Sequence, residues 1–173
     1  LRGLQPRFAS QTVTKHRHMK GRLRLREVMV IIMIKEIIHD PLFLSLASRP
    51  ATPDDVNIAV DLIETLHFHQ NSCVGMAANM IGERVRIIAF AGDEKLSRRY
   101  FVMFNPEIIK KEGAYDAEES CLALTGEPRP CKRYKTIKVK YQDENFAVKY
   151  KTYTGSTAET IQHEIDHCDG VLI

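Results

Sequence analysis

The segment GSTAETIQHEIDHCDG (155–170) limits what this chain can fold into more than any other stretch. Ser156 and Glu159 have the capping-box spacing that is typical of a helix start. Gly170 is typical of the residue that follows a helix. The segment is therefore predicted to form a helix.

Apolar and metal-binding side chains occupy different sides of this helix. At about 100° per residue, His163 and His167 project in nearly the same direction, and Glu164 lies at their flank. Roughly the opposite side carries an apolar set: Ala158, Ile161, Ile165 and Cys168. Such a helix needs apolar core on one side and a polar cavity on the other.

The HExxH spacing of residues 163–167 is typical of metal hydrolases, in which both imidazoles bind the ion and the glutamate acts as base. A catalytic site of this kind takes three protein ligands and keeps one position open. The extended motif would place a third histidine at position 173, but the chain has Ile173 there. We therefore expect the third ligand upstream, and a thiolate is the first candidate because it binds Zn or Fe(II) strongly. Cys168 lies on the apolar side of the helix. Spacing alone leaves three cysteines open: Cys73, Cys121 and Cys131.

Composition indicates a single globular domain. Of the 173 residues, 44% are hydrophobic and 27% are charged. No apolar run approaches the roughly 18 residues that would span a bilayer, so no membrane association is expected. A domain of this size needs no disulfides, which favours reduced cysteines and a cytoplasmic location.

Charge is unevenly distributed along the chain. Residues 1–28 carry eight Lys/Arg and one acid, a local charge of +7, whereas the rest of the chain sums to −4. We interpret residues 1–28 as a basic N-terminal extension, either a leader or an added segment, and residues 29–173 as one domain. A basic extension also suits contact with the ribosome surface, although no specific nucleic-acid binding is expected. The basic run CKRYK (131–135) is interpreted as a solvated edge.

The remaining pattern is that of one N-terminal helix followed by strands. Residues 51–69 are predicted to form the helix, with Thr52 as cap and Pro53 at the first helical position. Short alternating runs predict strands, and the last two suit a hairpin. These runs are VMVIIMI (28–34), VRIIAFA (85–91), YFVMF (100–104), TIKVKY (136–141) and FAVKYKTY (146–153).

Three segments occur in the order and form of the three signature motifs of the peptide deformylases: VGMAANMIG (74–82), ESCLA (119–123) and QHEIDHCDG (162–170). The last motif is matched in full, and the first two are matched with departures. The similarity runs from about Met33 to the end of the chain. The chain thus resembles the peptide deformylase family.

The resemblance implies that Cys121 joins His163 and His167 as a metal ligand. It implies that Glu164 is the general base and acid, and that the backbone N–H of Leu122 binds the developing oxyanion. The implied fold is α+β, with antiparallel sheets packed around a C-terminal HExxH helix and one N-terminal helix. The implied reaction removes the formyl group from the N-terminal formyl-methionine of nascent polypeptides. The cofactor would be one divalent ion, Fe(II) or Zn, with Ni or Co as alternatives.

The first motif supplies the residues expected at the substrate, Val74, Gly75 and Met80. In the family this motif has a glutamine where this chain has Met80, and that glutamine hydrogen-bonds the oxyanion or the metal water. A thioether cannot donate a hydrogen bond. Loss of one oxyanion donor costs about 100- to 1000-fold in turnover unless Asn79 or a water replaces it. Cys73 also replaces a glycine. The alternative function is therefore a deformylase-like, metal-binding paralogue with weak or altered activity.

Overall fold

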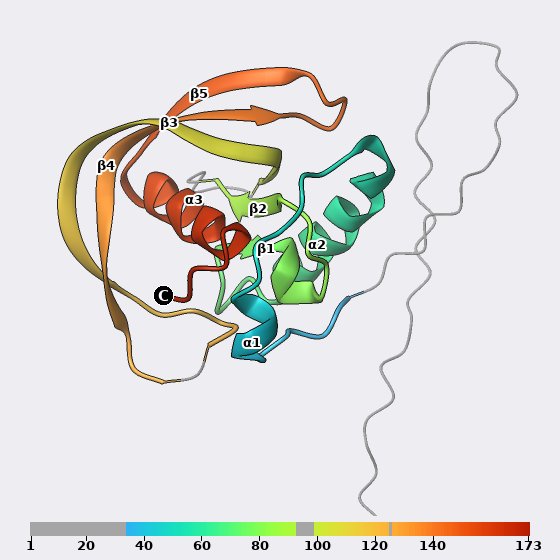
Figure 1. Ribbon diagram of the computed structural model, residues 1–173, viewed down its shortest axis with the longest axis horizontal. Coiled ribbons are helices and arrows are strands. Elements are labelled where there is room, and N and C mark those ends of the chain that lie inside the picture. The colour runs from blue at the N-terminus through green and yellow to red at the C-terminus, as the bar shows by residue number, and fades with distance from the viewer. Residues whose placement is uncertain (1–33, 93–98, 125) are drawn as a thin grey trace, which may run out of the picture.

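The computed structural model describes residues 34–92, 99–124 and 126–173 (Figure 1). The basic extension 1–28 lies outside these residues, as does almost all of the strand expected at 28–34. Ile34 is the only described residue of that run, and it is not in a strand. Among the described residues, no helix is long and apolar enough to cross a membrane.

One antiparallel sheet of five strands, in the order β1-β2-β3-β4-β5, forms the framework. The strands are β1 (Gly75–Ala77), β2 (Ile87–Ala91), β3 (Tyr100–Glu119), β4 (Arg129–Gln142) and β5 (Val148–Thr154). Each strand pairs with the next along the chain, so the sheet is a simple meander. In Figure 1, β3 and β4 curve around the C-terminal helix.

The helices cover the sheet and confirm the α+β class. They are α1 (Pro41–Leu44), α2 (Val56–Phe68) and α3 (Gly155–Cys168), with 3-10 turns at Pro53–Asp55 and Ala78–Ile81. The N-terminal helix predicted from residue 51 is confirmed, although its first turn is a 3-10 turn. The side chain of Asp55 accepts hydrogen bonds from Thr52 and Arg49 and so fixes this start.

The third strand is much longer than predicted. The sequence indicated an end before Asn105 and Pro106, because proline cannot donate to a ladder. The structure instead shifts register between Phe104 and Glu107, and the strand continues to Glu119. The Asn105 side chain stabilises this bulge through bonds to both backbone groups of Ala51, 2.7 and 2.9 Å long. The extra length carries β3 to the far side of α3.

Helix α3 lies in the core as its pattern predicts. Its apolar side packs against the concave face of the sheet, where Ile88, Phe90 and Ile137 are fully or almost fully buried. The buried helix residues on that side are Ala158, Ile161, Ile165 and Cys168. The helix begins at Gly155 after Thr154, slightly before the start expected at Ser156, and the Thr154 side chain makes no cap bond.

The C-terminal end of α3 is fastened to the loop after α1. Gly170 has a φ of +76°, and a Cβ at this position would collide with the carbonyl oxygen of Ser45. The amide of Ser48 donates to the carbonyl of Cys168 at 2.8 Å. Arg86 also forms an ion pair with Asp169. Glycine is therefore required here for conformation and for close approach.

We predict that Gly170→Ala destabilises the protein by more than the cost of a left-handed residue alone. Gly155→Ala is the matched control, because Gly155 has a φ of +60° and nothing within 4 Å of a built Cβ. The control should lose about 1–2 kcal/mol of unfolding free energy. Urea unfolding of both variants measures the difference, and equal losses would refute the role of the Ser45 contact.

Candidate metal centre

Three side chains from two segments of the chain converge on one point. Cys121 follows the end of β3, and His163 and His167 lie one turn apart on α3. Their candidate ligand atoms all lie within 4.8 Å of one another. The Sγ of Cys121 is 3.1 Å from Nε2 of His167. Of the cysteines that spacing left open, Cys73 and Cys131 are outside this group, as is Cys168 in the core.

The donor set fits a divalent ion. One sulfur and two imidazoles suit Zn or Fe(II), and three protein ligands leave a position open. Nδ1 of His163 lies 2.7 Å from a carboxylate oxygen of Glu119, which leaves Nε2 to face the cavity. The Ala123 amide donates to the sulfur of Cys121 at 3.3 Å, an interaction that stabilises a thiolate. The pairing of the Glu119 carboxylate with the His163 imidazole is of the kind that commonly orients a metal ligand.

A buried ion network holds Glu119 in place. Arg133 donates to both carboxylate oxygens of Glu119, at 2.6 and 2.7 Å, and also to Asp166 at 2.6 Å. Burial would raise the pKa of Glu119, but the bonds from Arg133 and His163 lower it to about 2. The solvated-edge interpretation of CKRYK is wrong for Arg133, which is only 4% exposed. Sequence reasoning assigned no role to Glu119, Arg133 or Asp166.

Glu164 lies next to the convergent ligands and is 3% exposed. Burial raises the pKa of this carboxyl to about 7, against the opposing charge of His163. Its Oε2 has no hydrogen-bond partner in the described part of the chain. A Cβ at Gly75 would lie 2.6 Å from Oε1 of Glu164 and 2.5 Å from Cγ2 of Thr160. Only glycine therefore lets β1 approach the base this closely.

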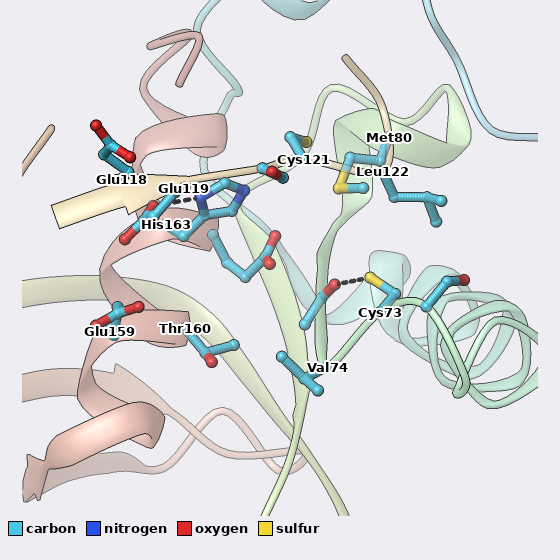
Figure 2. A pocket seen from close by; sticks show the side chains of 14 residues that line it. Cys73, Val74, Met80, Glu118, Glu119, Cys121, Leu122, Glu159, Thr160 and His163 are labelled. Atoms are coloured by element: carbon cyan, nitrogen blue, oxygen red, sulfur yellow. Dashed lines mark hydrogen bonds and ion pairs between the residues drawn. The ribbon is translucent and has the colours of Figure 1, made fainter. Parts of the chain in front are cut away.

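A cavity of about 260 Å³ opens in front of these groups (Figure 2). The structure brings the residues expected from the sequence to this one place. The cavity wall includes Val74, Gly75, Met80, Cys121, Leu122, His163 and Glu164, and His167 contacts Cys121 beneath it. Among the described residues, no group accepts a hydrogen bond from the Leu122 amide.

The neighbours of Met80 do not supply the hydrogen-bond donor that the resemblance to the family implies at position 80. Asn79 is fully buried, and its amide nitrogen donates to the carbonyl of His167 at 2.8 Å, away from the cavity. The thiol of Cys73 donates to the carbonyl of Gly75 at 2.6 Å (Figure 2). Burial raises the pKa of Cys73 to about 12, which keeps it a neutral thiol. Neither side chain therefore presents a donor where the glutamine would stand.

Comparison with known proteins agrees with this geometry. Residues 35–173 match the family model described as polypeptide deformylase. A peptide deformylase of Clostridium beijerinckii is 48% identical over 141 residues, which cover 82% of this chain and all of the relative. Peptide deformylase 1 of Clostridium perfringens is 38% identical over 69% of this chain and 82% of its own length. The crystal structure of a peptide deformylase from Legionella pneumophila superposes with a TM-score of 0.70 at 31% identity, covering 81% of this chain and 83% of that one. The chain belongs to the polypeptide deformylase family.

We predict that Arg133→Met destabilises the protein by about 3–5 kcal/mol, because it leaves the buried Glu119 charge without its main partner. The pKa of Glu119 is lowered on folding, so its stabilising contribution is complete above its unfolded pKa and is lost as pH falls towards 2. The difference in unfolding free energy between Arg133→Met and the wild type should therefore become smaller below about pH 4.5. Urea unfolding with a chelator present measures it, with the exposed neighbour substitution Lys132→Met as control. A loss that does not depend on pH would contradict this account.

Proposed function

We propose that this protein hydrolyses the formyl group from the N-terminal formyl-methionine of nascent polypeptides, with the aid of one divalent metal ion. The observation that carries the proposal is the convergence of Cys121, His163 and His167 within 4.8 Å, beside the buried Glu164. Family membership supports the same reaction.

The three convergent side chains are proposed to hold the ion. Fe(II) and Zn fit the thiolate and imidazole donors best, and Ni and Co are alternatives. When bound, such an ion lowers the pKa of water and polarises a carbonyl oxygen. Glu119 keeps the ring of His163 in the orientation that this role requires. Nε2 of His167 is the nitrogen directed at Cys121. The buried Nδ1 of the same ring has no hydrogen-bond partner in the described part of the chain.

Glu164 is proposed to move one proton twice. Its unpartnered Oε2 takes a proton from the water that attacks the formyl carbon. As the carbon–nitrogen bond breaks, the same oxygen gives the proton to the leaving amine nitrogen, so that formate and a free N-terminus result. The close approach of Gly75 and the burial of Glu164 exclude bulk water from the carboxyl group during this cycle.

Backbone groups are proposed to position the substrate. The amide of Leu122 is available to the developing oxyanion. β1 is an edge strand, and the carbonyl of Val74 just before it accepts a hydrogen bond from the Ala91 amide. The alternation of the ladder therefore directs the polar groups of Gly75 to the free edge. An extended peptide can pair with such an edge. The Cys73 thiol already donates one hydrogen bond to the Gly75 carbonyl, so the Gly75 amide is proposed as the main group that binds the peptide.

Two wider aspects of this function are also proposals. The four cysteines form no disulfide, which supports a proposed role in the reducing cytoplasm, where nascent chains are made. The basic extension 1–28 is proposed to strengthen contact with the negatively charged ribosome surface.

We expect Glu164→Gln to abolish formate release from a formyl-Met peptide, because the amide cannot shuttle the proton. Formate is measured with metal-replete protein, and metal content is measured on the same sample. Glu144→Gln, at an exposed carboxylate in the turn after β4, should retain full activity. Formate release by Glu164→Gln at the wild-type rate would reject the proposed base.

The second candidate function, a metal-binding paralogue with weak or altered activity, rests on Met80. We predict that Met80→Gln raises kcat/KM for a formyl-Met peptide, by up to about 100- to 1000-fold, because it restores an oxyanion donor. Steady-state kinetics at matched metal content measures this. High wild-type activity that Met80→Gln leaves unchanged would show that the donor is not needed.

A further inference from the structure

The turn that begins at Cys121 is held by hydrogen bonds from inside and from outside. The amide of Leu124 donates to the carbonyl of Cys121 at 3.3 Å and closes the turn. The amide of Ala123 donates to the sulfur of Cys121, also at 3.3 Å. From outside the turn, Nδ1 of His39 lies 3.0 Å from the carbonyl oxygen of Ala123, 84 residues away in the chain. Because a carbonyl oxygen only accepts, Nδ1 of His39 is the donor.

The segment that carries His39 also holds the first motif. The amide of Ile38 donates to the carbonyl of Met80 at 2.8 Å. Met80 and Leu122 both line the cavity, the first from the 3-10 turn and the second from the Cys121 turn (Figure 2). Two successive residues, Ile38 and His39, therefore connect the two stretches of chain that border the proposed oxyanion position.

The other end of this segment is fastened to α2. The amide of Lys35 donates to the hydroxyl of Thr65 at 3.0 Å. The ammonium group of Lys35 forms an ion pair with Asp61 at 3.3 Å. The segment 35–39 thus runs from the rigid helix α2 to the Cys121 turn, and His39 donates from a fixed position.

Packing does not account for the contact between His39 and the turn. His39 is an exposed residue, so burial of its ring contributes little. Ala123 is fully buried, and its carbonyl oxygen needs a hydrogen-bond partner. The hydrogen bond is therefore the interaction through which His39 acts on the turn.

We propose that His39 is a positioning residue for the deformylase reaction. Through Ala123 it holds the turn in the orientation that presents the Leu122 amide and the Cys121 sulfur to the reaction centre. His39 itself does not line the cavity. The inference rests on the proposed function and adds to it a residue outside the three motifs.

The kinetic test compares His39→Phe, which keeps a ring but has no donor, with His39→Asn, whose amide nitrogen can donate from nearly the position of Nδ1. The net worth of one such hydrogen bond corresponds to about two- to tenfold in an equilibrium, so His39→Phe should lower kcat for a formyl-Met-Ala peptide by about this factor. KM should be unchanged, because the oxyanion develops only in the transition state. His39→Asn should recover most of kcat. His67→Phe, at an exposed histidine of α2, is the control and should keep the wild-type kcat.

A measurement without substrate separates this inference from the proposed function. His39→Phe should release Zn to an excess of chelator about two- to tenfold faster than the wild type, because the turn that carries the Cys121 sulfur is less firmly held. His39→Asn should restore slow release. Equal kcat and equal Zn release in His39→Phe and the wild type would overturn the inference, as would equal losses in His39→Phe and His39→Asn. If His39→Phe failed to fold, His39→Leu would replace it in both comparisons. Wild-type protein that releases no formate would overturn the proposed function, whereas Zn release would still test His39.

Discussion

The hydrogen bond between Glu119 and Nδ1 of His163, 2.7 Å long, joins the sheet to α3. A buried carboxylate is costly unless it is paired, and Arg133 from β4 supplies that pair. Because Cys121 follows Glu119 by only two residues, the same contact sets the position of the sulfur relative to the imidazoles. The candidate ligands are therefore fixed by one network that crosses β3, β4 and α3. A shift in any of these elements would move the ligand set.

The shape of the sheet follows from the need to bury two sides of α3. The apolar side requires a concave apolar surface, which β2 and β4 provide through Ile88 and Ile137. The histidine side requires a strand that passes around the helix and places polar side chains next to it. The register shifts in β3 allow this strong curvature. The cavity and the core are thus opposite sides of one helix, so the fold cannot be described apart from the site.

Sequence reasoning reached the parts of the molecule that local patterns encode. These parts have a regular hydrophobic period or a residue that marks an end of an element. They are the HExxH helix, the turn at Gly170 and the two strands of the last hairpin. Spacing could not choose Cys121 from the other cysteines, because chain separation carries no information on distance, and the resemblance made that choice. Arg133 was read as a surface residue, since its partners are 14 and 33 residues away in the chain. Such partners give no local signal.

Met80 in the cavity wall has two opposing physical effects: it makes the surroundings less polar, and it offers no hydrogen-bond donor. It is 2% exposed and belongs to the apolar cluster that includes Leu66 and Ile81, so it extends apolar core to the edge of the cavity. Less polar surroundings strengthen the field of the nearby charges. Under the proposed mechanism, the absence of an oxyanion donor at this position costs about 3–4 kcal/mol. The amide of Asn79 cannot offset this, because it is committed to the carbonyl of His167. Under the proposed mechanism the loss of the donor is therefore the larger effect, and Met80 would chiefly weaken transition-state binding.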